Sequence, residues 1–117
     1  MRVSETVKSE IRDGVLVLTI DNPPVNALSH SVRLGLQTEL AKAKDDANIK
    51  AVVLACAGRS FISGADIREF GKPPQAPGLH EVLELLENSP RPVVAAIHGN
   101  ALGGGLETAL CCHFRIA

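Results

Sequence analysis

The sequence predicts an α/β fold in which helices pack on a largely parallel sheet. Two short extended runs, 6–10 and 15–20, flank Asp13-Gly14, a dipeptide typical of tight β-hairpin turns. Two uninterrupted apolar runs, 51–55 and 93–97, are typical of strands buried in parallel sheets. Helical spacing of apolar residues precedes each of these runs. Such alternation of helix and strand indicates right-handed crossovers between parallel strands.

The expected helices follow from the same periodicity. The first begins after Ser29, a plausible N-cap, and its apolar positions are Val32, Leu36, Leu40, Ala43 and Ala47. Its polar positions face elsewhere, namely Arg33, Gln37 and Lys44. A second helix is expected over 79–88, with Glu81, Glu84 and Glu87 on a solvated face, and a third over 106–112 before a strand that opens at Phe114. The proline-rich stretch 72–78 is expected to be a mobile loop.

Composition narrows the class of protein. The 117 residues are 45% hydrophobic and 21% charged, a balance typical of one globular domain. A net charge of −1 and three aromatic residues argue against a nucleic-acid partner. No apolar run approaches the roughly 18 to 20 residues of a membrane span, and the first residues lack a signal pattern, so a soluble protein is expected. The odd set Cys56, Cys111 and Cys112 predicts core thiols rather than disulfides or a metal site.

Chemistry is expected at the loops that follow the two apolar strands, because ligands of open α/β sheets gather beyond the carboxyl ends of the strands. Gly103 to Gly105 open the third helix, where the first N–H groups have no internal acceptor and can hold an oxyanion. Glu107 lies three residues beyond Gly104, about 60° around a helix of 3.6-residue period, so its carboxylate faces the same space. A plain turn, with Glu107 complementing the helix dipole, is the alternative interpretation. The glycines complete neither a dinucleotide fingerprint nor a Walker loop.

Three segments, 22–29, 58–67 and 95–109, together resemble the crotonase (enoyl-CoA hydratase/isomerase) superfamily, in the family's order and across most of the chain. The amino-acid sequences of segments 32–36, 64–73 and 105–110 are most similar to the hydratase/isomerase part of the multifunctional fatty-acid oxidation enzymes. Those enzymes continue into a 3-hydroxyacyl-CoA dehydrogenase. The resemblance implies a ClpP/crotonase-like fold of repeated β-β-α units. Residues 1–117 would form an incomplete, N-terminal part of it.

The resemblance also implies roles for individual residues. The backbone N–H groups of Ala65 and Gly104 would form an oxyanion hole for a thioester carbonyl, and Glu107 would be the first of two catalytic glutamates. The CoA-binding positions would be Arg59, for a phosphate, together with Ser63, Gly64, Asp66 and Gly103. No metal and no separate cofactor are implied, since coenzyme A is part of the substrate and NAD would be needed only if a dehydrogenase domain follows. The implied location is the cytoplasm of a bacterium or the peroxisome of a eukaryote.

The implied reaction is syn addition of water to a 2-enoyl-CoA in fatty-acid β-oxidation, with Δ3,Δ2-enoyl-CoA isomerisation as a second reaction. The family's second catalytic glutamate lies beyond Ala117, so this chain alone is expected to be a poor hydratase and to lack isomerase activity. Two alternatives stay open. One is another crotonase-fold acyl-CoA enzyme, such as a hydrolase or decarboxylase. The other is a non-catalytic CoA-binding or assembly fragment whose exposed sheet edge promotes self-association.

Expectations also attach to three further side chains. His98 stands at the end of a strand beside the glycine loop, and packing or a hydrogen bond to backbone is expected of it rather than catalysis. Arg91 and Lys72 are candidates for assisting CoA phosphates.

Overall fold

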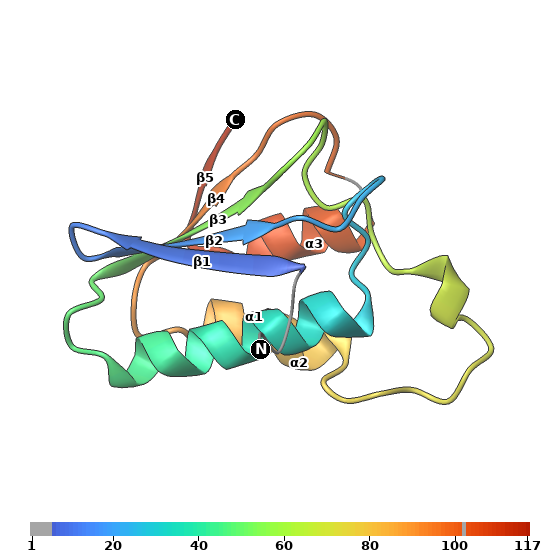
Figure 1. Cartoon of the computed structure of the whole chain (residues 1–117), viewed down its shortest axis with the longest axis horizontal. Coiled ribbons are helices and arrows are strands. Elements are labelled where there is room, and N and C mark those ends of the chain that lie inside the picture. Colours follow the sequence, from blue (N-terminus) through green and yellow to red (C-terminus); the bar gives the residue numbers. More distant parts are fainter. Residues whose placement is uncertain (1–5, 102) are drawn as a thin grey trace.

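The structure, a computed structural model, describes residues 6–101 and 103–117. In this part of the chain the strands form one five-stranded sheet in the order β1-β2-β3-β4-β5. Only the first pair, β1 (Val7–Arg12) and β2 (Val15–Ile20), is antiparallel. The later strands β3 (Ala51–Cys56), β4 (Val93–Ala96) and β5 (Phe114–Ile116) all run parallel to β2 (Figure 1). The predicted parallel α/β fold is confirmed.

The hairpin turn at Asp13-Gly14 has the conformation that the sequence indicated. Asp13 and Gly14 both adopt positive φ, 50° and 83°, as the two central residues of a type I′ turn do. Arg12 pairs directly with Val15 across this turn, which fixes the register of β1 on β2.

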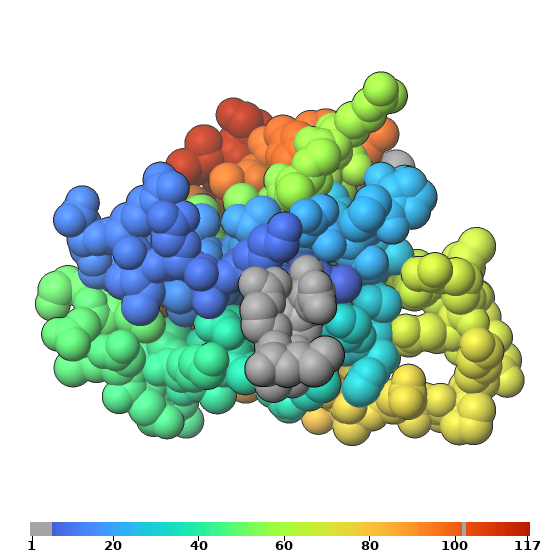
Figure 2. Space-filling view, viewed as in Figure 1, coloured from blue at the N-terminus to red at the C-terminus, as the bar shows by residue number. Residues whose placement is uncertain are grey.

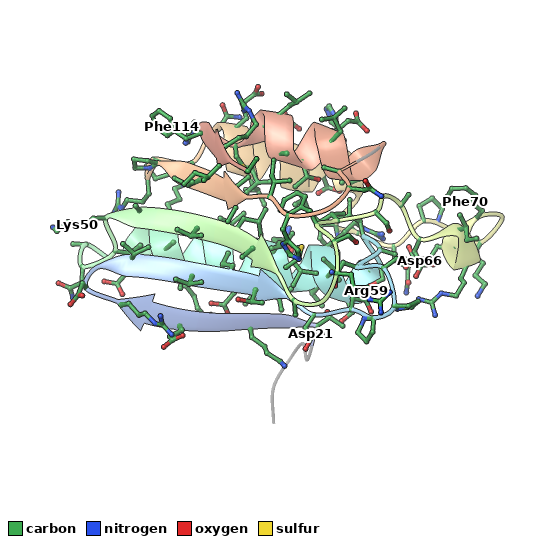
Figure 3. All side chains as sticks on the ribbon, turned by 90° about the horizontal axis from the view of Figure 1, so that it is seen from above. Asp21, Lys50, Arg59, Asp66, Phe70 and Phe114 are labelled. Atoms are coloured by element: carbon green, nitrogen blue, oxygen red, sulfur yellow. The ribbon has the colours of Figure 1, made fainter. Side chains whose placement is uncertain are left out.

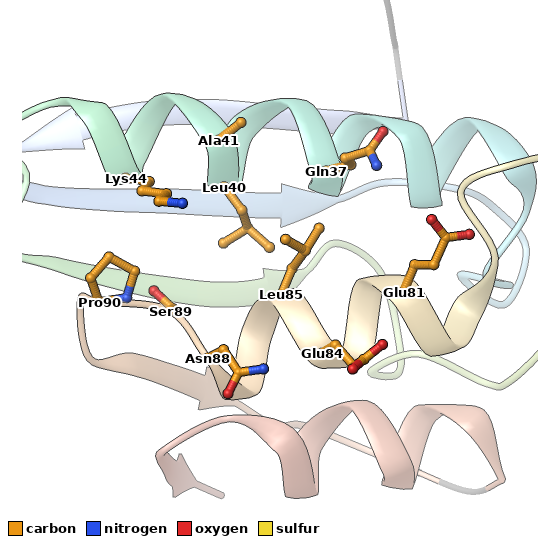
Figure 4. Close-up of a pocket in the computed structure, with 10 residues that line it drawn as sticks. All are labelled: Gln37, Leu40, Ala41, Lys44, Glu81, Glu84, Leu85, Asn88, Ser89 and Pro90. Atoms are coloured by element: carbon orange, nitrogen blue, oxygen red, sulfur yellow. The ribbon is translucent and has the colours of Figure 1, made fainter.

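Three helices connect the parallel strands: α1 (His30–Asp45), α2 (Leu79–Glu87) and α3 (Gly104–Cys111). Because each crossover moves one strand further in the same direction, right-handed connections place all three helices on one face of the sheet. Figure 4 shows α1, α2 and α3 side by side in that order. The residues of β3 alternate between fully buried and half-buried, so only one face of the sheet is closely covered within the described residues.

The predicted N-cap of α1 is confirmed, and the structure shows a further cap at α2. The Ser29 hydroxyl accepts a hydrogen bond from the N–H of Val32 at 3.4 Å, as an N-cap does. At the start of α2 the N–H of Gly78 donates to the carboxylate of Glu81 at 2.9 Å.

One expectation for α1 is wrong. Arg33 was expected on a polar face, and instead it is only 8% exposed. Helical periodicity places Arg33 beside Leu40 at the edge of the apolar face, and the chain between η1 (Ile67–Glu69) and α2 folds back over it. Within this segment, residues 69–78, the stretch 72–78 was expected to be mobile, and hydrogen bonds from Arg33 tie it to α1 at Gln75 and Pro77. Figure 2 shows it standing out from the body of the molecule with a hollow behind it.

The repeat of the fold is visible in the segments between strands and helices. After β2 the chain passes through Leu28 before α1, and after β3 it passes through Ala65 before η1 and α2. Leu28 and Ala65 pair with each other in a parallel bridge outside the main sheet. Each unit therefore consists of a long strand, a short paired segment and a helix, the β-β-α arrangement that the resemblance implied.

Candidate active site

The candidate site lies beyond the carboxyl ends of β2, β3 and β4. Figure 3 shows Arg59, Asp66 and Phe70 at this end of the sheet, with Lys50 at the other end. Three loops meet here, residues 21–29, 57–66 and 97–103, although Leu102 is outside the described residues.

Asn26 holds the first two loops together. It is 4% exposed and has a positive φ of 54°, a conformation that asparagine tolerates better than most residues. Its side-chain amide donates to the carbonyl oxygens of Ala57 and Ser60 at 2.8 and 2.9 Å, while its amide oxygen accepts the N–H of Asn22 at 2.9 Å. Every polar atom of this buried side chain is used, so the relative position of the loops is well defined.

His98 and Gly99 join the second loop to the third. The ring Nε2 of His98 lies 2.8 Å from the carbonyl oxygen of Gly58, and the His98 carbonyl accepts the N–H of Phe61 at 2.8 Å. Gly99 has a φ of 67°, and a Cβ atom there would lie 2.6 Å from the Arg59 carbonyl oxygen. The interpretation of His98 as a residue that bonds to backbone is confirmed.

The N–H groups of Ala65 and Gly104, which are expected to bind an oxyanion, lie close together although they are 39 residues apart in sequence. A Cβ atom placed on Gly104 would lie 3.5 Å from the backbone nitrogen of Ala65. Neither the N–H of Ala65 nor that of Gly104 has a hydrogen-bond acceptor within residues 6–101 and 103–117. Two free donors beside the same space are the arrangement that stabilises an oxygen atom as it gains negative charge.

Leu28 and Leu79 form the apolar surround of these donors. Each has a methyl carbon 3.3 Å from the same point beside Gly104. The N–H of Leu28 also donates to the carbonyl oxygen of Gly64 at 2.7 Å, and that carbonyl belongs to the peptide group that carries the Ala65 N–H. The bridge between Leu28 and Ala65 therefore fixes the plane of the donor peptide.

Each of the three consecutive glycines is required for a different structural reason. Gly103 adopts φ 51° and ψ −124°, a conformation that side chains disfavour. Gly104 leaves open the space beside Ala65. Gly105 packs so closely on the second loop that a Cβ atom would lie 1.9 Å from the carbonyl oxygen of Ile62.

Glu107 lies in the first turn of α3, and its N–H donates to the carbonyl of Gly103 at 3.0 Å. Its side chain is exposed, and within the described residues it forms no hydrogen bond or ion pair. Its charge is felt by Cys111 one turn further along: burial, then the carboxylates of Glu87 and Glu107, raise the pKa of that thiol. The carboxylate is thus available to an incoming molecule.

The carboxylate of Asp66 is hydrogen-bonded within the chain, and its expected place in the CoA-binding turn stays a prediction. It is 6% exposed and accepts hydrogen bonds from Nε, NH2 and the backbone N–H of Arg68 at 2.9, 2.8 and 3.0 Å. Hydrogen bonding to Arg68 holds the pKa of Asp66 below its usual range despite the burial. Asp66 therefore orients the start of η1 and the exposed Arg68 guanidinium. Both border a hollow lined by Ser63, Ala65 and the prolines of the first loop.

The basic residues divide between the two ends of the sheet. Arg59 is exposed at the site, and its guanidinium has no partner within the described part of the chain. Lys72 lines the hollow behind segment 69–78. Arg91 precedes β4, and it donates to the carbonyl oxygens of Ile49 and Asp46 at 2.7 and 3.4 Å. Arg91 thus lies at the amino ends of the strands, at the opposite end of the sheet from the candidate site.

Two of the three thiols, those of Cys56 and Cys112, are buried. Burial raises the pKa of Cys56 and of Cys112 to about 12, as expected of core thiols. In residues 6–101 and 103–117 no cluster of His, Cys, Asp and Glu is placed to hold a metal ion. The same residues contain no helix with the length and apolar character of a membrane span.

A separate groove lies between α1 and α2, away from the glycine loop (Figure 4). Leu40 and Leu85 form its apolar floor, and Lys44, Glu81 and Glu84 lie at its margins. None of the predicted site residues lines it.

Several residues that shape the site were not identified from the sequence. Asn26, Leu28, Leu79 and Arg33 act through contacts with loops distant in sequence. Only Asn26 carried a usable signal, since asparagine after a Pro-Pro turn is a candidate for positive φ.

The described residues form an α/β domain in which the loops after parallel strands bring the backbone N–H groups of Ala65 and Gly104 close together. Comparison with known proteins identifies the family to which the chain belongs. The model of the family described as enoyl-CoA hydratase/isomerase matches residues 10–117. The chain therefore belongs to the enoyl-CoA hydratase/isomerase family.

Individual relatives support this family assignment. The peroxisomal bifunctional enzyme of Danio rerio is 47% identical over 107 residues, which cover 92% of this chain and 15% of that protein. A probable enoyl-CoA hydratase of Bacillus subtilis is 44% identical over 110 residues, 88% of this chain and 43% of that protein. The solved structure of enoyl-CoA hydratase from Bacillus anthracis superposes with a TM-score of 0.87 at 32% identity, covering 97% of this chain and 47% of that one. The crotonase fold is confirmed, and this chain spans less than half the length of each of these relatives.

Proposed function

We propose that this chain binds the thioester carbonyl of an acyl-CoA between the N–H groups of Ala65 and Gly104. The convergence of these two free donors from separate loops is the observation that carries the proposal. The relatives named as enoyl-CoA hydratase and as bifunctional enzyme support a 2-enoyl-CoA as the substrate. Coenzyme A then arrives as part of the substrate, and the chain needs no further cofactor for this step.

The proposed reaction adds water across the double bond of the enoyl thioester, with hydroxyl going to the β carbon and a proton to the α carbon. Negative charge develops on the carbonyl oxygen during this addition, so aimed N–H donors stabilise the transition state more than the substrate. Glu107 serves as one of the two acid/base groups that the addition needs. Arg59 binds a CoA phosphate, and Ser63, Gly64 and Gly103 border the path of the bound molecule. Such a protein works in the cytoplasm of a bacterium or in a peroxisome.

The test is binding with a spectroscopic readout of the carbonyl. Hexanoyl-CoA with a ¹³C thioester carbonyl and free CoA are titrated into the chain, and the infrared carbonyl stretch is recorded in the complex. Tighter binding of hexanoyl-CoA than of CoA, with the stretch moved to lower frequency, is the expected result. Equal affinities and an unshifted stretch would exclude the oxyanion hole. Release of free thiol would instead favour a hydrolase built on the same two donors.

A role in assembly is the second candidate. Leu110, Phe114 and Ile116 are 58%, 61% and 62% exposed, and they follow one another along α3 and the edge strand β5. Exposed apolar side chains beside an unpaired strand edge are typical of a surface that associates with another chain.

A further inference from the structure

Arg33 is buried, and every nitrogen of its guanidinium donates at least one hydrogen bond. Its guanidinium donates to the carbonyl oxygen of Pro77 at 2.7 Å, of Leu28 at 2.7 Å and of Gln75 at 3.3 Å, and to the Glu69 carboxylate at 3.0 Å. Removing a charge from water is costly unless it is paired and hydrogen-bonded, so these contacts must be well formed for the residue to remain inside. Arginine suits the position because its planar fork reaches several acceptors at once.

The acceptors belong to the segments that surround the two proposed oxyanion donors. Leu28 supplies both the methyl group beside Gly104 and the N–H that holds the Gly64 carbonyl. Pro77 lies two residues before Leu79, which has a methyl carbon 3.3 Å from the same point beside Gly104. Arg33 is therefore the common anchor of the two apolar neighbours of the donor pair.

Glu69 completes the anchor. Its second carboxylate oxygen accepts the N–H of His30 at 2.8 Å, while the first accepts from Arg33. Burial raises the pKa of Glu69, but the hydrogen bonds from His30 and Arg33 outweigh that effect and keep the pKa below its ordinary value. The carboxylate is thus ionised at neutral pH and balances the charge of Arg33.

We propose that Arg33 is a positioning residue of the acyl-CoA site. By holding Leu28 against Ala65 it fixes the direction of the Ala65 N–H, and by holding Pro77 it fixes the place of Leu79. The site then prefers an acyl thioester over free CoA by an amount that depends on Arg33, although Arg33 does not touch the thioester. The inference rests on the proposed function for its ligand, but the orientation of the Ala65 peptide can be measured without any ligand.

Two variants, Arg33→Gln and Arg33→Lys, test this inference. Arg91→Gln and Arg91→Lys are the matched controls, because Arg91 also donates to two backbone carbonyls but lies at the opposite end of the sheet. The measurements are the ratio of the dissociation constants for CoA and hexanoyl-CoA, and the amide ¹H and ¹⁵N shifts of Ala65 in the free protein.

Arg33→Gln is expected to reduce the preference for hexanoyl-CoA about two- to tenfold, the range set by one well-formed hydrogen bond, with little change in the affinity for CoA. The Ala65 resonance should move. Arg33→Lys keeps the charge and the alkyl stem, so it should fold even if Arg33→Gln does not, and it should lie between wild type and Arg33→Gln. The Arg91 variants should change neither the ratio nor the resonance.

A folded Arg33 variant with the wild-type ratio and an unmoved Ala65 resonance would overturn the inference. If wild type itself does not distinguish hexanoyl-CoA from CoA, the proposed function fails. The Ala65 resonance alone then decides whether Arg33 positions this peptide.

Discussion

The backbone nitrogen of Ala65 lies 3.5 Å from the position that a Cβ atom of Gly104 would occupy. This relationship explains why position 104 needs a glycine although its helical conformation does not. An oxygen atom bound to Ala65 must come within about 2.7 to 3.1 Å of that nitrogen, and a methyl group on residue 104 would stand in its way.

Gly104→Ala should therefore weaken binding of hexanoyl-CoA about tenfold, as expected for the loss of one or two hydrogen bonds. Besides the Ala65 nitrogen, the new methyl group would meet the ends of the Leu28 and Leu79 side chains at 3.3 Å, so each needs to move by only a few tenths of an ångström. The free energy of unfolding should consequently change by less than about 1 kcal/mol. Calorimetric titration with hexanoyl-CoA and with CoA measures the first effect, and urea unfolding measures the second. Unchanged hexanoyl-CoA affinity in a folded variant would contradict the role of Gly104.

Gly105→Ala, in contrast, should mainly lower the free energy of unfolding. Its Cβ atom would lie 1.9 Å from the Ile62 carbonyl oxygen, a backbone atom that cannot move without shifting the second loop. Overpacking of this kind costs about 1 to 3 kcal/mol of unfolding free energy. Urea denaturation followed by circular dichroism measures it. Gly78→Ala is the control, since its nearest contact would be an ordinary 3.7 Å to the flexible Glu81 side chain, and it should leave the midpoint nearly unchanged.

Hydration of crotonyl-CoA by the 117-residue chain should be slow, and Glu107→Gln should abolish this residual hydratase activity. Hydration needs two acid/base groups, and the other carboxylates of the described residues near the site, Asp66 and Glu69, are held by Arg68 and Arg33. Loss of the enoyl absorbance with time gives the rate, and Glu84→Gln on the exposed side of α2 is the control. Robust turnover by wild type, or by the Glu107 variant, would require a different acid/base assignment.

Alkylation should distinguish the three thiols. Cys111 is half-buried, whereas burial raises the pKa of Cys56 and of Cys112 to about 12 and keeps reagent away from them. Because only the thiolate reacts, Cys111 should be labelled first by iodoacetamide at pH 8, although its own pKa is raised by burial and nearby carboxylates. Peptide mass spectrometry over time gives the order, and labelling of all three at one rate in the folded protein would disagree with the structure.

The apolar edge formed by Phe114 and Ile116 should promote self-association at micromolar concentrations. Phe114→Lys and Ile116→Lys remove little packing, since both side chains are mostly exposed, and charge on an edge strand opposes pairing. Sedimentation velocity over a concentration series should show a shift toward monomer in both variants. Phe70 is a similarly exposed aromatic residue beside the candidate site, and Phe70→Lys should not produce this shift. A wild-type chain that remains monomeric throughout would rule out the assembly candidate.

The sequence by itself determined those features that depend on neighbours along the chain. Helical and strand periods, the Asp13-Gly14 turn and the Ser29 cap each depend on a few adjacent residues, so the elements were predicted to within a few positions. The glycines before Glu107 likewise carried their signal locally, because a helix N-terminus leaves its own amides free.

Only the tertiary structure decided which of these parts meet. The burial of Arg33, the occupied carboxylate of Asp66 and the place of Arg91 at the far end of the sheet all depend on loops that pass over residues distant in sequence. The pairing of the Ala65 and Gly104 amides depends on the order of the strands that deliver them. Local propensities do not encode these contacts, because they form only when the whole chain buries its apolar faces together.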